Sequence, residues 1–138
     1  MRVLWLLVLA CAGLAWGASR YAVVVNPHSA VSHLSRETIA ALYLDKRRTL
    51  DGRRAVLLNL PFDHPVRRSF ERHVLRIGRE ALEHYWLKAH FRGHRPPKVL
   101  KSERSVALFV KKVPGAVGYM HRALAEKEGL KVVYEWEE

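Results

Sequence analysis

Predominantly apolar runs along this chain predict buried strands. One run covers residues 21–25 and ends at Asn26-Pro27, and a second covers residues 55–60 and ends at Pro61. Runs of this length that are rich in β-branched residues and bounded by turn residues are typical of strands. The remaining expected strands lie at residues 116–120 and 130–136.

Apolar positions three and four apart predict four longer helices between these strands. The first covers residues 35–45, with Ser35 as N-cap and Glu37 in its first turn. The second begins at Pro65. Its expected buried stripe is Val66, Phe70 and Val74. The third helix ends near Gly93, and its expected stripe is Ala81, Leu82, Tyr85, Trp86 and Ala89. The fourth begins at Ser102, with the expected stripe Val106, Phe109, Val110 and Val113.

The alternation of strands and helices predicts the fold class. Strands separated by helices favour an α/β fold with a central mixed sheet flanked by helices. A short helix around Leu124 completes the pattern, and the charged stretch 45–54 carries the turn signal Asp51-Gly52. No repeat or linker divides residues 18–138, so we expect one domain there.

The first 17 residues have the three parts of a secretory signal. Arg2 supplies the positive charge, residues 3–15 are apolar and uncharged, and small residues stand at Ala15 and Gly17. We therefore expect cleavage after Gly17 and a periplasmic domain over residues 18–138. The apolar run is short for a membrane span, which takes about 20 residues, and a retained anchor is the alternative interpretation.

Cys11 leaves the type of processing open. Residues 8–11, Val-Leu-Ala-Cys, are an imperfect version of the sequence that precedes a lipidated cysteine. The alternative is a small apolar residue within a discarded signal. Cleavage after Gly17 would leave no cysteine and hence no disulfide, because Cys11 is the only cysteine in the chain.

Positive charge is concentrated in the middle of the chain. The formal net charge is +11, or +10 without Arg2. Residues 46–112 contain 18 basic and 6 acidic side chains, against 3 and 5 in residues 113–138. A basic region of this kind favours anionic partners: small oxyanions, nucleic acid or an acidic envelope surface.

Three stretches resemble a known family when taken in order. Residues 34–46 read Leu-Ser-Arg-Glu-Thr-Ile-Ala-Ala-Leu-Tyr-Leu-Asp-Lys, and residues 109–119 end in Pro-Gly-Ala-Val-Gly-Tyr. Between them lie residues 62–70. This order resembles the phosphate-type periplasmic solute-binding proteins that feed ABC transporters, and the resemblance implies that residues 62–70 correspond to the family's phosphate loop and helix start.

The resemblance implies one lobe of a binding protein that has two. It covers nearly all of residues 18–138, and their length leaves no room for the second lobe. The family's loop offers an arginine and an Asp-Gly-Ser-Gly-Thr run to phosphate. Here residues 59–69 read Asn-Leu-Pro-Phe-Asp-His-Pro-Val-Arg-Arg-Ser, without either glycine and with Pro65 lacking an N–H donor. The sequence therefore supports the fold more strongly than tight phosphate binding.

The candidate anion site lies at this helix start. Its residues are Asp63, His64, Arg67, Arg68 and Ser69, since exposed N–H groups and arginine side chains suit an oxyanion. The structural alternative is a solvated basic face that continues through Arg72 and Arg76. Further hydroxyls stand at Ser32 and Ser35, for which turn and cap chemistry is the alternative.

Other chemistry finds little support. His84, His90 and His94 have tolerable ligand spacing but need not share a face, and we expect no metal and no cofactor. Neither a nucleophile elbow nor a pair of working carboxylates is present, so we expect no enzyme activity. The nucleic-acid-binding motifs are absent as well.

Two functional hypotheses remain. The first is an exported, non-catalytic module that holds a small phosphate-like oxyanion weakly or contacts an envelope protein through the same face, with no transmembrane segment after signal cleavage. The alternative is a basic accessory protein that binds polyanions or the envelope through its charge, without a small-molecule pocket.

Overall fold

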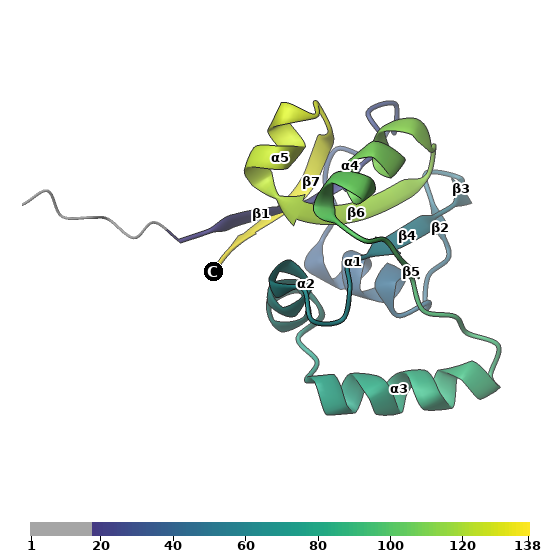
Figure 1. Ribbon diagram of the computed structural model, residues 1–138. Helices are drawn as coiled ribbons and strands as arrows, with labels where there is room; N and C mark the ends of the chain where they lie inside the picture. Colours follow the sequence, from purple (N-terminus) through teal and green to yellow (C-terminus); the bar gives the residue numbers. More distant parts are fainter. Residues whose placement is uncertain (1–17) are drawn as a thin grey trace, which may run out of the picture.

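The computed structural model describes residues 18–138, so the predicted signal and Cys11 lie outside the described residues (Figure 1). Strands and helices alternate along the chain. In order they are β1 (Arg20–Val25), α1 (Arg36–Tyr43), β2 (Thr49–Leu50), β3 (Arg53–Arg54), β4 (Val56–Asn59), α2 (Pro65–Phe70), the π-helix η1 (Glu71–Leu75), α3 (Arg79–Phe91), β5 (Lys98–Val99), α4 (Glu103–Lys112), β6 (Ala116–His121), α5 (Arg122–Lys127) and β7 (Lys131–Glu137).

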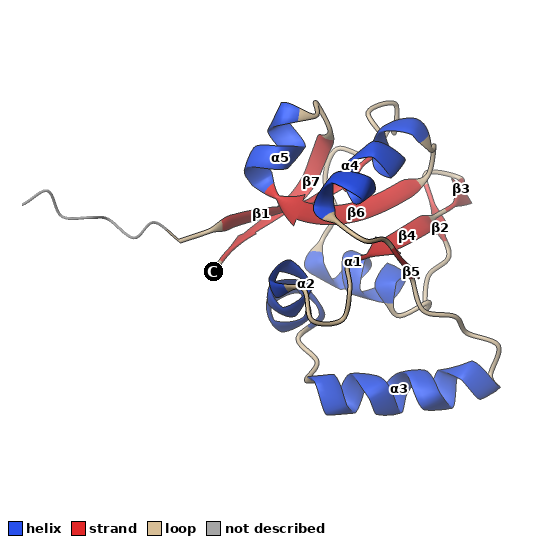
Figure 2. Cartoon of the chain, in the orientation of Figure 1, coloured by secondary structure: helices blue, strands red, loops and turns tan. Residues whose placement is uncertain are grey.

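Five strands form one mixed sheet in the order β5-β4-β6-β1-β7 (Figure 2). β4 runs parallel to both β5 and β6, whereas β1 is antiparallel to both β6 and β7. β1 is therefore the one strand of this sheet that opposes the other four. The predicted α/β class with a central mixed sheet and flanking helices is confirmed.

Helices cover the two faces of this sheet, α4 and α5 on one side and α1 and α2 on the other (Figure 1). Alternate residues of β6 face opposite layers, as the period of a strand requires. Gly118 lies under α4, where an added Cβ would collide with Val106. The next residue, Tyr119, stacks on Phe70 of α2 with ring centroids 4.0 Å apart.

The predicted helix starts at Ser35 and Ser102 are confirmed. The Ser35 hydroxyl accepts a hydrogen bond from the Thr38 N–H at 3.1 Å, and the Ser102 hydroxyl accepts one from Ser105 at 3.1 Å. Both helices end earlier than the apolar spacing predicted: Tyr43 and Lys112 are their last residues. A left-handed Asp45, with φ 57°, follows the first of these ends.

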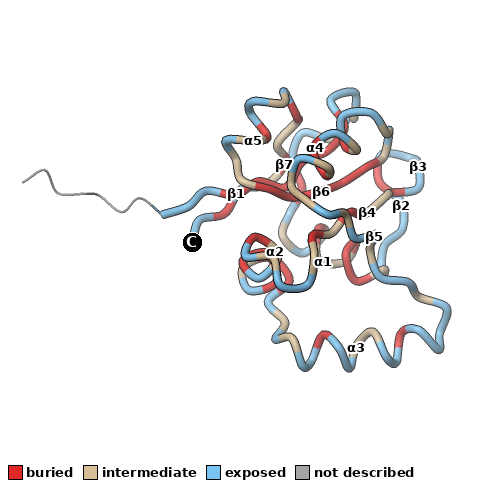
Figure 3. Tube along the Cα trace, viewed as in Figure 1, coloured by how far each residue is buried: buried red, intermediate tan, exposed pale blue. Residues whose placement is uncertain are grey.

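The helix that begins at Pro65 continues into η1, and its predicted stripe of Val66, Phe70 and Val74 is buried. The third predicted stripe is only partly correct. Leu82 and Ala89 are buried, Tyr85 and Trp86 are half-buried, and Ala81 is exposed. The reason is that α3 lies beneath α1 and α2 and does not contact the sheet broadly, so most of its surface faces solvent (Figure 3).

Three two-residue strands were not predicted. β2 and β3 pair around the Asp51-Gly52 turn, and β5 adds a short edge to β4. Two residues are too few to show the alternation by which a strand is predicted. None of the helices within residues 18–138 combines the length and the apolar composition that a membrane span requires.

Candidate functional site

The carboxyl ends of four strands meet at one edge of the sheet. The residue 60–64 loop follows β4 there, α5 follows β6, and the chain ends after β7. Since β1 runs the opposite way, Ser19 reaches the same edge, and Ser19 and Glu138 exchange backbone hydrogen bonds of 2.9 and 3.0 Å. Open α/β sheets bind ligands outside such an edge, where connections leave in opposite directions. Here the chain leaves β4 towards β5 and leaves the neighbouring strand β6 towards β7, in the opposite direction. The point where the connections diverge therefore lies between β4 and β6, beside the 60–64 loop.

The start of α2 offers few backbone donors. Pro65 has no N–H, and the Val66 N–H donates to the His64 ring at 3.1 Å. The Arg68 N–H donates to the His64 carbonyl at 3.1 Å. Of the first four positions of this helix, only Arg67 retains a backbone N–H that could point at a ligand. His64 therefore serves as the N-cap of α2.

The Arg67 side chain turns back to hold the 60–64 loop. Its Nη1 donates to the Leu60 carbonyl at 3.0 Å, and its Nε lies 3.6 Å from the Glu71 carboxylate. Arg79 also bonds Glu71, at 3.0 Å, and donates to the Phe62 carbonyl. The Arg79 guanidinium covers the Phe62 ring, with Cζ 3.8 Å from the centroid. Arg67 and Arg79 thus hold the backbone at both ends of residues 60–62. Together with Glu71 they form what we call the clamp.

Glu71 is the buried centre of this clamp, with a side chain only 6% exposed. Three atoms of the clamp are buried without a hydrogen-bond partner among the described residues: Arg67 Nε, Glu71 Oε2 and Arg79 Nη1. A cavity of about 260 Å³ adjoins it, and its lining combines the polar residues Asn59, Arg67 and Glu71 with mostly apolar side chains, including Trp86. Buried polar atoms beside such a cavity bind a water molecule or a backbone group more readily than a charged ligand, because a charge is costly to bury.

The other residues predicted for the anion site do not share one environment. Asp63 and Arg68 are exposed, and neither side chain has an ion-pair partner within residues 18–138. Ser69 is fully buried, and its hydroxyl accepts the Trp136 indole N–H at 2.9 Å. The structure thus gives Ser69 a role in anchoring β7 and leaves Arg68 as the exposed arginine of the helix start.

Ser32 and Ser35 do not join this group. Ser35 caps α1, next to Arg36, whose Nη1 donates to the Val74 carbonyl at 2.7 Å. Val74 lies near the end of η1, whereas His64 caps the start of α2. A helical segment of 11 residues is roughly 16 Å long, so Ser35 lies far from the 60–64 loop. Ser32 is exposed, and its side chain makes no hydrogen bond within residues 18–138.

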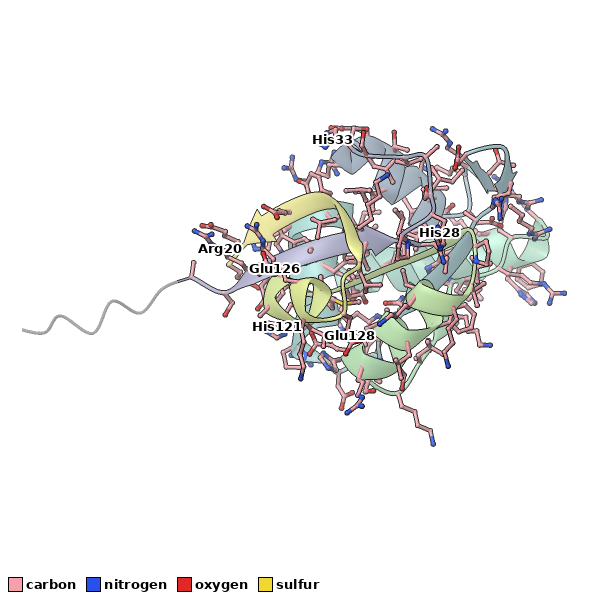
Figure 4. All side chains as sticks on the ribbon, turned by 90° about the horizontal axis from the view of Figure 1, so that it is seen from above. Arg20, His28, His33, His121, Glu126 and Glu128 are labelled. Carbon is pink, nitrogen blue, oxygen red and sulfur yellow. The ribbon has the colours of Figure 1, made fainter. Side chains whose placement is uncertain are left out.

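Charges at the other half of the edge are paired. His121 Nδ1 lies 2.7 Å from Glu103, and Arg122 contacts both Glu126 and Glu135 at 3.0 Å. Figure 4 shows Arg20, His121 and Glu126 gathered where β1 begins, with His28 at the opposite end of that strand. Little positive charge is left unpaired on this half.

A buried polar network supports the loop from inside. The Tyr119 hydroxyl bonds the Asn59 side chain, and the Leu60 N–H donates to the same hydroxyl at 3.3 Å. Burial raises the pKa of Tyr119 far above its usual value, so the phenol stays neutral. This network fixes the end of β4, from which the loop departs.

No three His, Cys, Asp or Glu side chains within residues 18–138 gather in a metal-binding arrangement. His94 Nδ1 instead pairs with Asp45 at 3.1 Å, while His84 and His90 are exposed on α3.

The sequence analysis missed Glu71, Arg79 and Phe62 as parts of the loop support. One signal was available, because Arg67 and Glu71 stand at the i, i+4 spacing of helical ion pairs. Arg79 gave no such signal, since its contact depends on the turn between η1 and α3.

No family model matches this chain, and no curated protein matches it. Several solved structures match it. An ABC-type phosphate transport receptor of Vibrio cholerae matches with TM-score 0.67 and 17% identity over 84% of this chain and 46% of its own. A protein of Clostridium perfringens with bound phosphate, assigned as a phosphate ABC transporter substrate-binding protein, matches with TM-score 0.67 and 14% identity over 84% of this chain and 44% of its own. PstS of Borrelia burgdorferi matches with TM-score 0.62 and 16% identity over 84% of this chain and 47% of its own.

These identities are low, so the likeness shows the fold alone. The chain spans slightly less than half the length of each of these structures. That share agrees with the one-lobe resemblance in the sequence. Residues 18–138 thus have the fold found in about half of a phosphate ABC transporter substrate-binding protein.

Proposed function

We propose that this chain is an exported, non-catalytic binding module that holds a small phosphate-like oxyanion with low affinity at the carboxyl edge of its sheet. The observation that carries the proposal is the exposed Arg68 in the first turn of α2, directly after the clamped 60–64 loop. Ser19 and Glu138 lie at the same edge, and the described residues share their fold with structures that include one with bound phosphate.

The donor set limits the affinity. Arg68 can make a bidentate contact to an oxyanion, and the Arg67 N–H can add one backbone contact. The glycines that would let more N–H groups approach the ligand are absent, and Pro65 removes another donor. A site with so few donors on an open edge fits a dissociation constant on the order of millimolar, or roughly 4 kcal/mol of binding free energy.

A partner at the same edge is the second part of this proposal. The resemblance to one lobe of a two-lobed binding protein supports this part, because in such a protein the ligand lies between the lobes. A small oxyanion would then be one contact among several beneath an envelope protein. Export to the periplasm is supported by the signal-like residues 1–17.

Anion titration followed by amide chemical shifts tests the proposal on the domain of residues 18–138. We expect phosphate and sulfate to shift the amides around Arg67 and Arg68 with millimolar midpoints. Arg68→Gln should weaken this response about fivefold, because one charge-assisted contact is lost. Lys112→Gln removes the same charge from the end of α4, far from the edge, and should leave the midpoint unchanged.

Two outcomes would overturn the oxyanion claim. One is the absence of any shift at the edge with phosphate, sulfate or acetate at tens of millimolar. The other is an equal loss in Arg68→Gln and Lys112→Gln, accompanied by a steep dependence on salt. This second result would favour the alternative function, in which the net charge binds polyanions without a pocket.

A further inference from the structure

The opposite end of the sheet carries a second, more basic hollow. β5 begins opposite Leu58, so the outer edge of β4 at Val56 and Leu57 has no neighbouring strand within residues 18–138. A groove of about 370 Å³ opens there, between the β2–β3 hairpin and the segment that joins α3 to β5. Its basic lining residues are Arg48, Arg54, Arg95 and Lys98.

Most of this charge has no counter-charge within residues 18–138. Asp45 is the acidic residue that lines the groove, and it already bonds Arg48, the Arg95 N–H and His94. The side chains of Arg54 and Arg95 make no ion pair or hydrogen bond with other described residues. Lys98 has only the Phe109 ring, 5.4 Å from its Nζ.

A neighbouring hollow extends the basic surface. It measures about 270 Å³ and is lined by Lys46, Lys88 and Arg92 together with Tyr85 and His94. The bonded pair Asp45–His94 separates the two hollows, because Asp45 lines one and His94 the other. Cations held this close repel one another unless an anion lies among them.

We propose that the groove beside residues 55–57 binds an anion with two or more closely spaced phosphate groups. A phosphate ester carries about −1.5 to −2 charge at neutral pH, so two such groups would balance Arg54, Arg95 and Lys98, the cations of the groove that have no carboxylate partner within residues 18–138. Arg54 and Arg95 approach from opposite walls, and guanidinium groups bind phosphate oxygens in pairs. The site lies at the other end of the sheet from Arg68 and does not depend on the proposed function.

The lining also has a structural alternative, because charged side chains protect an open strand edge from pairing with another chain. Edge protection requires only that charge be present. Phosphate binding requires these particular side chains, and this difference can be measured.

The test compares two double variants with the same net charge. The groove variant is Arg54→Gln with Arg95→Gln, and the control is Arg104→Gln with Lys127→Gln; all four side chains are exposed. The probe is inorganic tripolyphosphate, titrated by calorimetry into the domain of residues 18–138. We expect a dissociation constant on the order of 10 µM at low salt, weakened about tenfold or more in the groove variant and no more than about twofold in the control.

Amide shifts locate the site. Tripolyphosphate should shift residues around Leu57 and Gly93, whereas the weak oxyanion site would shift those around Arg68. A second arm uses phosphatidylcholine vesicles containing about 20% cardiolipin, whose headgroup bears two phosphates. Vesicle binding that the groove variant loses and the control retains supports the same groove with a lipid headgroup as the source.

Three results would overturn the inference: no binding of tripolyphosphate or of the vesicles, equal losses in the two double variants, or shifts confined to the carboxyl edge. The first would leave edge protection as the role of these arginines. Failure of the Arg68 experiment alone would leave the groove unaffected, because the two sites share no residue.

Discussion

The two ends of the sheet use arginine in opposite ways. At the carboxyl end, Arg67 and Arg79 share the buried Glu71 and hold backbone carbonyls of the 60–64 loop. At the amino end, Arg54 and Arg95 line a groove without a carboxylate of their own. A basic sequence therefore does not locate an anion site by itself: paired arginines support structure, and unpaired ones remain available for ligands.

Burial explains why the first pair cannot act as ligand groups without cost. The Arg67 side chain is only 16% exposed, and a buried guanidinium is stable only when it is paired and hydrogen-bonded. Withdrawing Arg67 from Glu71 to meet an anion would leave that carboxylate buried and alone. The sequence favoured Arg67 and Arg68 equally, but of the two only Arg68 is exposed and has no ion-pair partner within residues 18–138.

The largest expected effect comes from breaking the carboxyl-end clamp. Glu71→Gln leaves two partly buried guanidinium groups without their shared counter-charge and should lower the free energy of unfolding by about 3 kcal/mol. Urea denaturation of the domain at neutral pH measures this loss. Glu83→Gln, on the exposed surface of α3, is the matched control and should change stability by less than about 0.5 kcal/mol. Equal effects would show that the clamp contributes no special stability.

Sequence alone predicted the interior better than the site. The β-branched run of residues 21–25 and the caps at Ser35 and Ser102 carry local signals, because strand burial and helix capping depend on neighbours in the chain. The fate of Ser69 depends on Trp136, 67 residues further on. The exposure of α3 likewise depends on where the chain turns after η1, and spacing along one helix cannot show that.

The next prediction tests whether Ser69 has a structural role or binds the anion. Ser69→Ala leaves the Trp136 indole N–H buried without an acceptor and should cost about 1–2 kcal/mol of unfolding free energy. Phosphate binding at the carboxyl edge should stay unchanged. Ser32→Ala, at an exposed serine, is the control and should alter neither quantity. A loss of phosphate binding in Ser69→Ala without a loss of stability would instead return Ser69 to the anion site.

Acid titration examines the one carboxylate that lines the basic groove. Burial alone would raise the pKa of Asp45, but hydrogen bonds from Arg48, the Arg95 N–H and His94 lower it below its usual value. The folded state therefore gains stability from ionised Asp45 above about pH 4, and this gain disappears as the pH falls through the lowered pKa.

Asp45→Asn should accordingly cost about 1 kcal/mol or less at neutral pH, and the difference from the unmodified domain should shrink towards pH 2. Denaturation curves across that range provide the measurement. Asp63→Asn, at an exposed aspartate, is the control and should give a small difference that does not vary in this way. A cost for Asp45→Asn that is constant with pH would show that its hydrogen bonds matter without its charge.

The smallest effect concerns the unpaired arginines themselves. If Arg54 and Arg95 repel the cations around them, replacing both with glutamine should raise the free energy of unfolding by a few tenths of a kcal/mol at low salt. The gain should vanish as salt rises from about 50 to about 200 mM, because the repulsion is screened. Arg104→Gln with Lys127→Gln should give a smaller gain, although it removes the same charge. Equal gains would mean that repulsion is spread over the whole basic surface, whereas a gain confined to the groove variant would show that the amino end retains charge that the fold itself does not neutralise.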